Sequence, residues 1–216
     1  MPGFARSLRW LLPLVLLAAA VPAALAQTAP PPASAGKTQT AVFAGGCFWC
    51  VEEAFEKVPG VLTAVSGYIG GKTANPTYEQ VSGGATGHAE AVEVTYDPGK
   101  VKYQQLVDWF WRNIDPLDAH GQFCDKGSEY RSAIFYRGDE QKNIAEDSKK
   151  ALDASGRLKQ PVVTEITAAG PFYLAEDYHQ DYYKKNANRY QFYKYGCRRV
   201  QRLEQLWGKA TPPPNS

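Results

Sequence analysis

The sequence predicts an α+β fold: a two-layer sandwich with a mixed sheet, related to the ferredoxin-like split β-α-β pattern. Two observations lead to this class. Segments with strand character and segments with helical periodicity follow one another in the order strand, helix, strand, strand, helix, strand, helix, strand. The part of the chain that carries them, residues 39–209, has the length of one ordinary domain with a full core.

The first half of this domain supplies three strands and a helix. "TAVFAGG" is a short apolar run ended by two glycines, which indicates a buried strand. A helix is predicted over residues 47–58, and Pro59-Gly60 ends it. Its apolar residues recur at three- and four-residue steps: Phe48, Val51, Phe55 and Val58. "VLTAVSGYIG" and "HAEAVEVTYDP" are the second and third strands, and a long Gly-rich loop, residues 70–87, lies between them.

The second half continues the pattern. Residues 101–113 have helical spacing, "RSAIFYR" is a fourth strand, residues 139–155 form a further helix, and "PVVTEITAAG" is a fifth strand. Residues 171–207 are rich in tyrosine, and only "RRVQRLEQLW" shows helical spacing there. No order of elements is predicted for that segment.

The first 26 residues predict a secretory signal peptide. Arg6 and Arg9 form a basic start, an apolar run follows over residues 10–24, and a small-x-small sequence ends at Ala26. Two prolines interrupt the run, and it is short for a spanning helix, so a cleaved signal is favoured over a retained anchor. We expect cleavage before Gln27 and a periplasmic or secreted mature protein.

The flanks of the domain lack hydrophobic periodicity. Residues 27–38 are rich in proline, alanine and serine, which predicts a disordered tether, and residues 210–216 predict a flexible tail. Removing the signal peptide takes away two arginines and no acidic residue, which leaves 22 residues of each sign. A neutral chain offers no electrostatic basis for binding nucleic acid. We expect a monomer that binds no nucleic acid.

Four cysteines remain after processing, and in an oxidising compartment two structural disulfides are the simplest expectation. The position of Cys47 points instead to chemistry. It follows Gly45-Gly46 and begins the first helix, where free N–H groups and the positive end of the helix dipole stabilise a thiolate. A lowered pKa is therefore expected for Cys47, and less so for Cys50 one turn later.

Glu90 is the second candidate. It begins the third strand on the same face as Val92 and Val94, which favours burial. A carboxyl group in such a low-dielectric place stays protonated near neutral pH and can donate a proton. The alternative is a glutamate on the solvent face.

Five stretches then carry a resemblance to a known family. "GGCFWCVEEAFEKVPGV", "NPTYEQV", "TGHAEAVEVTYDP", "DKGSEYRSAIFY" and "AEDYHQDYY" resemble, in this order, peptide methionine sulfoxide reductase of the A type. The resemblance covers about residues 40–207. It implies an enzyme that reduces methionine S-sulfoxide, in proteins and free, through a cysteine sulfenic acid and then a disulfide. Such an enzyme repairs proteins after oxidation.

The resemblance also implies roles for residues. Cys47 matches the nucleophile and Glu90 the acid that protonates the sulfoxide oxygen, with the hydroxyls of Tyr78 and Tyr130 as donors to that oxygen. The substrate-binding residues that it implies are an apolar wall for the S-methyl group and a polar orienting group: Phe48, Trp49 and Asp125.

The cysteine that resolves the sulfenic acid stays open. The family motif usually has glycine or another small residue where this chain has Cys50, and the glycine-rich C-terminal segment with two recycling cysteines is lacking. Cys50 needs little movement to reach Cys47 because the two are three residues apart in one helical turn. Cys197, near two arginines, is the close rival, and Cys124 could pair with Cys197 as a staple or a second relay.

Three other classes compete with this interpretation. A thioredoxin-like oxidoreductase shares C-x-x-C at a helix start, but its facing proline turn has only Pro76 as a candidate. A zinc site needs two close ligand pairs, and Cys124 and Cys197 each stand alone, so no metal is expected. A binding module of the same fold is the third. For the reductase we expect no bound cofactor, and a thioredoxin-like or other dithiol as external reductant.

Overall fold

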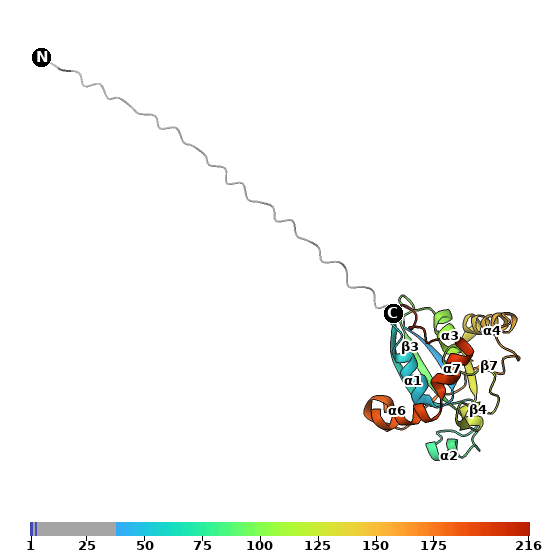
Figure 1. Ribbon diagram of the computed structural model, residues 1–216. Coiled ribbons are helices and arrows are strands. Elements are labelled where there is room, and N and C mark those ends of the chain that lie inside the picture. The colour runs from blue at the N-terminus through green and yellow to red at the C-terminus, as the bar shows by residue number, and fades with distance from the viewer. Residues whose placement is uncertain (2, 4–37) are drawn as a thin grey trace. The chain divides into compact units, whose positions relative to one another are not determined.

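The computed structural model of the chain describes Met1, Gly3 and residues 38–216 (Figure 1). The signal peptide predicted over residues 1–26 and the tether predicted over 27–38 fall outside the described residues, apart from Met1, Gly3 and Thr38. Both remain predictions. Within the described part, no helix is both long enough and apolar enough to cross a membrane.

The centre of the fold is a six-stranded mixed sheet in the order β7-β6-β1-β3-β2-β8. Its strands are β1 (Gln39–Gly45), β2 (Val61–Ile69), β3 (Ala89–Tyr96), β6 (Ser132–Tyr136), β7 (Glu165–Ala168) and β8 (Tyr173–Leu174). A separate two-stranded hairpin joins β4 (Gly121–Gln122) to β5 (Asp125–Lys126). All neighbours in the main sheet are antiparallel except β6 and β7.

Seven α-helices and one 3₁₀ turn are present in the described residues. They are α1 (Phe48–Glu56), α2 (Tyr78–Ser82), α3 (Tyr103–Trp111), the 3₁₀ turn Ser128–Tyr130, α4 (Gly138–Ala154), α5 (Tyr182–Lys185), α6 (Ala187–Gly196) and α7 (Arg199–Trp207). The five predicted strands and the helices α1, α3, α4 and α7 are confirmed, with ends shifted by a few residues.

The first three strands form the predicted split β-α-β unit. Strands β1 and β2 both run antiparallel to β3, which lies between them, and α1 connects β1 to β2. The α+β class with a mixed sheet is therefore confirmed. This topology places the start of α1 beside the start of β3, because β1 ends where β3 begins.

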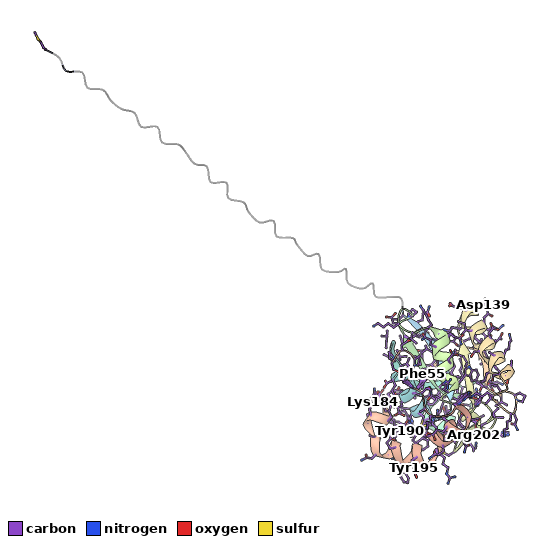
Figure 2. The ribbon with its side chains drawn as sticks, turned by 45° about the horizontal axis from the view of Figure 1, so that its top comes forward. Phe55, Asp139, Lys184, Tyr190, Tyr195 and Arg202 are labelled. Atoms are coloured by element: carbon purple, nitrogen blue, oxygen red, sulfur yellow. A yellow bond between two sulfur atoms is a disulfide. The ribbon has the colours of Figure 1, made fainter. Side chains whose placement is uncertain are left out.

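Hydrophobic residues divide between the two faces of the sheet, as strand alternation requires. The larger cluster joins Phe43 of β1 and Val92 of β3 to α1, α3, Ala145 of α4 and Trp207 of α7. Phe43 stacks on Phe55 with ring centroids 4.7 Å apart; Figure 2 labels Phe55 among the side chains. A smaller cluster on the other face includes Val42 and Ala91 and is covered in part by Phe172.

One region differs from its prediction, and for another no elements were predicted. The predicted Gly-rich loop 70–87 contains α2, whose capping box pairs Thr77 with Gln80. The tyrosine-rich segment holds β8, α5 and α6, for which no pattern was recognised. In the segment predicted as a flexible tail, Asn215 donates to the Lys100 carbonyl at 2.8 Å; its flexibility remains a prediction.

Candidate active site

Cys47 lies at the junction between β1 and α1. It is the N-cap residue of α1 and is 5% exposed. The junction turns at Gly46, which has φ +79°, and a Cβ atom there would lie 2.5 Å from Cβ of Gln122. Only glycine fits this turn without strain. The sequence therefore directs the Cys47 side chain into the interior at the C-terminal end of the central strand β1.

Glu90 meets the beginning of α1 from β3. Its Oε2 accepts the backbone N–H of Phe48 at 3.0 Å, which satisfies one of the helix's free donors. The side chain is 3% exposed, so the predicted burial is confirmed. Burial, with added repulsion from Asp125 and Glu129, raises the pKa of Glu90 to about 8 despite the Phe48 hydrogen bond. The carboxyl group is thus protonated at neutral pH and able to donate.

Tyr78 and Tyr130 approach the same place from α2 and from the 3₁₀ turn. Burial and the nearby Glu90 raise the pKa of Tyr78 to about 12 and raise that of Tyr130 further. Both hydroxyls therefore keep their protons as hydrogen-bond donors. The Tyr78 backbone N–H donates to Glu176 Oε1 at 2.8 Å, which fixes the start of α2 to the C-terminal segment.

Phe48 and Trp49 form an aromatic wall together with residues of α5. The Trp49 ring stacks on Tyr182 with centroids 3.7 Å apart, and its indole N–H donates to His179 Nδ1 at 3.1 Å. Glu52 accepts the Asp181 backbone N–H at 2.6 Å and so attaches the start of α5 to α1. The wall is therefore built by a segment whose structure the sequence analysis did not predict.

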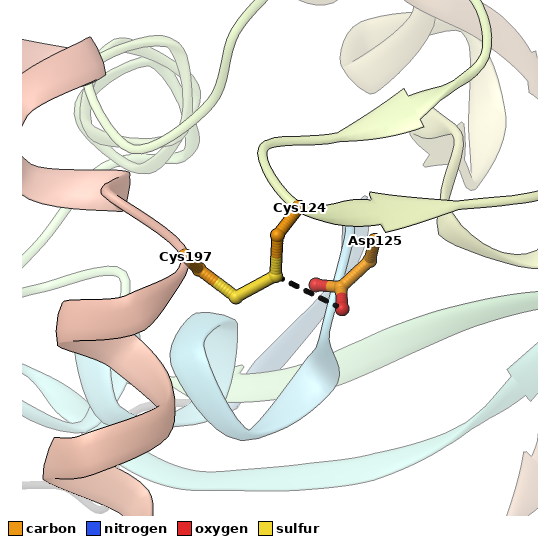
Figure 3. Close-up of side chains that lie close together, drawn as sticks. All are labelled: Cys124, Asp125 and Cys197. Carbon is orange, nitrogen blue, oxygen red and sulfur yellow. Dashed lines mark hydrogen bonds between the residues drawn. A yellow bond between two sulfur atoms is a disulfide. The ribbon is translucent and has the colours of Figure 1, made fainter.

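Asp125 and Tyr193 complete the lining of the site. The Tyr193 hydroxyl, on α6, donates to Asp125 Oδ2 at 2.5 Å. Burial raises the pKa of Asp125, while the Tyr193 hydrogen bond and Arg199 oppose the rise. Asp125 also lies beside Cys124, with Sγ and Oδ1 3.6 Å apart (Figure 3).

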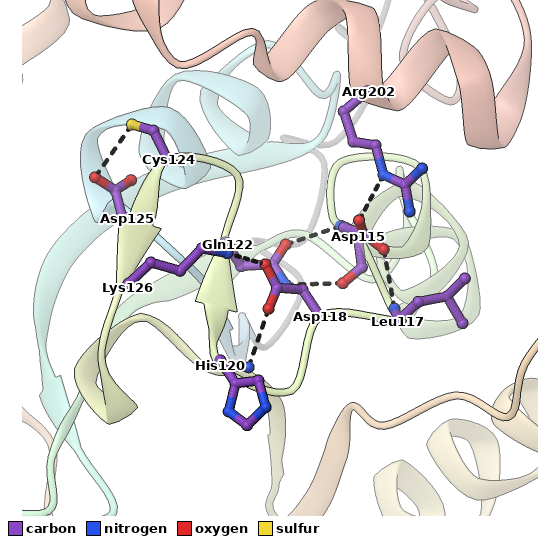
Figure 4. A network of polar contacts seen from close by, with 9 residues as sticks. All are labelled: Asp115, Leu117, Asp118, His120, Gln122, Cys124, Asp125, Lys126 and Arg202. Carbon is purple, nitrogen blue, oxygen red and sulfur yellow. Dashed lines mark hydrogen bonds and ion pairs between the residues drawn. The ribbon is translucent and has the colours of Figure 1, made fainter.

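The hairpin that carries Asp125 is held by a polar network (Figure 4). The Gln122 side chain accepts the Asp115 N–H at 2.8 Å and donates to the Asp115 carbonyl at 2.7 Å. Arg202 of α7 donates to Asp115 Oδ2 at 2.6 Å, and Lys126 pairs with Asp118 at 2.5 Å. These contacts fix the hairpin against α7 and so set the position of Asp125.

These side chains surround one cavity of about 240 Å³. It is lined by Cys47, Phe48, Trp49, Tyr78, Glu90, Asp125, Tyr130 and Tyr193. The first seven are all the catalytic and substrate-binding residues that the sequence analysis named, and the structure brings them together. Tyr193 was missed. The tyrosine richness of residues 171–207 was its only signal, and it did not single out one position.

Cys50 faces a different space. It is buried one turn after Cys47 and lines a second cavity of about 300 Å³ with Lys194 and Arg199. Cys47 and Cys50 are the free cysteines of the chain. Burial, together with Cys50 and Glu90, raises the pKa of Cys47, whereas the Cys47 hydrogen bond and the nearby Arg199 lower that of Cys50.

The predicted lowering of the Cys47 pKa is therefore wrong. Burial of the thiol is the largest cause of the raised pKa, and the Phe48 N–H at the helix start is already bonded to Glu90.

Cys124 and Cys197 are joined in a disulfide, with Cα atoms 4.8 Å apart. It connects the β4–β5 hairpin to the junction of α6 and α7 (Figure 3). This is the pairing that the sequence analysis left open as a staple or a second relay. Cys197 is therefore not a free thiol in this state.

Two groups of side chains in the described residues are close enough to suggest a metal ion. One contains Cys124 and Cys197, whose sulfur atoms are bonded to each other. The other joins Glu52 to two acids, Glu56 and Asp181, that pair with Lys184 at 2.5 and 2.7 Å. Glu52 itself already accepts two hydrogen bonds. The ligand atoms of both groups are thus engaged with protein partners.

Comparisons with known proteins agree on one family. A family model described as "Peptide methionine sulfoxide reductase" matches residues 39–211. Relatives called peptide methionine sulfoxide reductase MsrA include one from Bacillus licheniformis, 52% identical over 175 residues, covering 81% of this chain and 97% of the relative. Another, from Bacillus velezensis, is 54% identical over 171 residues, covering 79% and 97%.

Solved structures show the same fold. Methionine sulfoxide reductase A of Corynebacterium diphtheriae matches with a TM-score of 0.63 and 38% identity, over 69% of this chain and 76% of that one. Reduced Mxr1 from Saccharomyces cerevisiae matches with a TM-score of 0.64 and 31% identity, over 70% and 87%.

Proposed function

The chain belongs to the peptide methionine sulfoxide reductase family and reduces methionine S-sulfoxide, and on this premise we propose that Cys47 is its nucleophile and Glu90 its acid. One observation carries the assignment. Seven residues named from separate stretches of sequence line a single cavity around Cys47. Family membership also excludes the thioredoxin-like alternative for the C-x-x-C motif.

In the first step the Cys47 sulfur attacks the sulfoxide sulfur. Glu90 gives its proton to the sulfoxide oxygen, which makes the oxygen a better leaving group, while Tyr78 and Tyr130 donate hydrogen bonds to it. The oxygen is transferred to Cys47, methionine leaves, and the thiol proton of Cys47 replaces the one that Glu90 lost. Cys47 is oxidised to the sulfenic acid by two electrons, and the substrate is reduced by two.

The substrate's S-methyl group lies against Phe48 and Trp49, and Asp125 orients the polar part of the substrate or water. The support for this placement is the geometry of the wall, because Trp49 is fixed by Tyr182 on one side and by His179 through its N–H. We add Tyr193 to this set, since it holds Asp125 by a hydrogen bond.

Cys50 resolves the sulfenic acid in this proposal. Its sulfur attacks Cys47, the S–S bond forms, the S–O bond breaks, and the oxygen leaves as water. Cys50 is free and one turn away, whereas Cys197 is bonded to Cys124. An external dithiol, of which a thioredoxin-like protein is the expected kind, then reduces the disulfide by two electrons. These steps use thiol, carboxyl and tyrosine hydroxyl groups of the protein and the external dithiol, and the proposal includes no bound cofactor.

The test begins with the mature protein, methionine S-sulfoxide and dithiothreitol. We expect Cys47→Ser to abolish reduction, and full activity in this folded variant would overturn the assignment. Peptide mapping after one turnover without reductant then identifies the resolving residue. A Cys47–Cys50 link supports Cys50, and a link from Cys47 to Cys197 or Cys124, or a persistent sulfenic acid, contradicts it.

The compartment is a separate part of the proposal. A cleaved signal peptide over residues 1–26 would deliver the protein to the periplasm or outside the cell. Met1 is the one methionine of the chain, so the mature enzyme contains no residue that could become its own substrate. This supports the proposal weakly. Fractionation that found a cytosolic protein retaining residues 1–26 would refute it.

A further inference from the structure

Arg199 is a buried cation without an acidic partner. It begins α7, is 4% exposed, and its guanidinium group donates to the carbonyls of Gly45 at 3.3 Å and Asn113 at 2.5 Å. The guanidinium carbon Cζ of Arg199 lies 4.3 Å from the centroid of the Phe123 ring. Among the described residues, no carboxylate lies within ion-pair distance of it. A buried charge held only by carbonyls and a ring is costly unless a counter-charge is near.

The other basic residue close to Cys50 is already neutralised. Lys194 of α6 pairs with Glu53 at 2.5 Å, and Glu53 also binds Lys57 at 2.7 Å and the Tyr190 hydroxyl at 2.5 Å. Figure 2 shows Tyr190 on α6. Both lysines thus share the Glu53 carboxylate, and Arg199 is the buried cation that lines this cavity without an ion pair among the described residues.

Cys50 and Arg199 line the same cavity of about 300 Å³, which lies between α1, α3 and the C-terminal helices. The buried or half-buried titratable groups that face Cys50 from the elements packed against it are Cys47, Glu53, Glu90, Tyr190, Tyr193, Lys194 and Arg199. The exposed charged residues that line the same cavity are Lys57, Arg112, Glu204 and Lys209. Glu90 and the two tyrosines are neutral at pH 7, and Glu53 and Lys194 compensate each other. Lys57, Arg112 and Lys209 are exposed to solvent, so Arg199 is the buried cation that remains beside Cys50.

We propose that Arg199 is a positioning residue for the resolving step: its guanidinium group is the counter-ion that keeps Cys50 as a thiolate beside Cys47. The inference rests on the proposed role of Cys50 as the resolving cysteine. The Cys50 thiolate attacks the sulfenic sulfur, the S–S bond forms, and the S–O bond breaks. The leaving hydroxide takes the proton of Glu90 and departs as water, and Glu90 regains a proton from solvent.

The Cys124–Cys197 disulfide explains how Arg199 is held there. The bond between Cys124 and Cys197 is visible in Figure 3. Phe123 directly precedes Cys124, and Arg199 follows Cys197 by two residues, so the bond ties together the two chain segments that carry the guanidinium group and the ring it stacks on. Phe123 and Arg198 both have positive φ angles, 56° and 54°, which non-glycine residues rarely adopt. The surrounding contacts and the disulfide hold the backbone at Phe123 and Arg198 in this conformation.

A titration without turnover tests the proposal. In Cys47→Ser protein with ¹³C-labelled cysteine, Cys50 is the single free thiol, and its Cβ shift reports ionisation. We expect a midpoint below the ordinary thiol value of about 8.5. Arg199→Met should raise the midpoint by at least about one unit, and Arg199→Lys should restore most of the shift. Lys209→Met, a cation removed from the same cavity, should leave it unchanged.

A single-turnover experiment gives the second readout. In protein with Cys47 intact, Arg199→Met should release one methionine at an unchanged rate but lose the Cys50 thiol more slowly. The slowing should approach about tenfold per unit of midpoint shift at pH values below the native midpoint and should disappear at high pH. A role in folding alone would slow both steps at every pH.

Several results would overturn the proposal. A Cys50 midpoint at or above about 8.5 in Cys47→Ser protein contradicts it before any arginine variant is made. An unchanged midpoint in folded Arg199→Met also contradicts it, and if that variant does not fold, Arg199→Gln is judged by the same criterion. Peptide mapping that identified another resolving cysteine would refute the role of Cys50 but would leave the titration result as it stands.

Discussion

The face of β3 on which Glu90 lies determines whether its carboxyl group keeps its proton. Glu90 points to the same face as Val92 and Val94, where the larger core cluster lies, so its carboxyl group is removed from water. Glu93, on the opposite face, pairs with Arg137 at 2.6 Å instead. Two glutamates three residues apart are therefore an acid that stays neutral and an ordinary surface anion.

Replacing the acid should slow the chemical step. Glu90→Gln cannot donate a proton to the sulfoxide oxygen, and general acid catalysis supplies ~10²- to 10⁴-fold. We expect a loss of this size in the rate of methionine release in one turnover. Glu93→Gln is the matched control and should keep the native rate. Equal rates for Glu90→Gln and the native protein would show that another group protonates the oxygen.

The same substitution should stabilise the fold. The pKa of Glu90 is raised from 4.5 to about 8 in the folded state, so its contribution to stability is complete below pH 4.5 and is lost as pH rises to about 8. Gln has no such loss, and its oxygen can accept the Phe48 N–H. We expect Glu90→Gln to be more stable than the native protein at pH 7 by up to about 3 kcal/mol.

Urea denaturation at several pH values measures this effect. The difference in unfolding free energy between the two proteins should widen by about 1.4 kcal/mol per pH unit between about 5 and 8. A difference that does not change with pH would mean that Glu90 is ionised in the folded protein at these pH values.

Single residues were predictable where a local pattern or the resemblance marked them. The burial of Glu90 was predictable because alternate residues of a strand lie on the same face. Cys47 was singled out as reactive because it follows two glycines at the start of a helix. Tyr193 and Arg199 could not be found this way, because their roles depend on partners in distant segments: Asp125 for the tyrosine, Gly45 and Asn113 for the arginine. The prediction of a lowered Cys47 pKa was wrong because the helix-start argument did not include burial of the thiol, the largest cause of the rise, or the hydrogen bond from the Phe48 N–H to Glu90.

At the scale of elements, the turn between β1 and α1 sets the direction of the nucleophile. Gly46→Ala introduces a methyl group at φ +79° and 2.5 Å from Gln122, whose side chain holds the Asp115 backbone. We expect a loss of stability of roughly 2–4 kcal/mol and a strong loss of activity as Cys47 moves. Urea denaturation and the sulfoxide assay measure the two effects.

Gly138 provides the control for this variant. It has φ +80°, but a Cβ atom there would meet nothing within 4 Å. Gly138→Ala should therefore cost only the backbone strain, about 1 kcal/mol, and leave activity intact. Equal losses in the two variants would show that the contact with Gln122 does not matter.

Elements with strong periodicity were predictable, and short elements were not. Helix α2 has five residues and lies among glycines, although "TYEQ" is a capping-box sequence that could have marked its start. Helix α6 exposes Phe192 and Tyr195 while burying Tyr190, so its apolar residues do not lie on one face. Its position depends on contacts with α1 rather than on its own pattern.

For the whole molecule, the fold class was predictable from the sequence, but the covalent connection was not. The split β-α-β arrangement is implied by the order of strands and helices. Cys124 and Cys197 are 73 residues apart, and nothing in the local sequence of either indicates the other. Their pairing depends on how the C-terminal helices pack on the hairpin, which is a property of the complete fold.

Removing this disulfide should destabilise the protein. Closing a loop of this length restricts the unfolded chain, and the entropic estimate is about 4 kcal/mol. We expect the double variant Cys124→Ala/Cys197→Ala to melt at a lower temperature by calorimetry. Dithiothreitol should lower the melting temperature of the native protein and leave that of the double variant unchanged. Equal melting temperatures without reductant would show that the bond adds no stability.

The disulfide also decides what a single break in the chain does to the enzyme. Residues 155–161, between α4 and β7, are exposed at all but one position and lie inside the span that Cys124 and Cys197 enclose. A protease site engineered after Lys159 would yield two pieces that remain covalently attached, with Tyr193 and Arg199 on the second. The nicked protein should run as one band on a non-reducing gel and still release one methionine in a turnover without reductant. Opening the disulfide would then free the C-terminal piece to dissociate, so the integrity of the active site depends on either an unbroken backbone or an intact sulfur bridge.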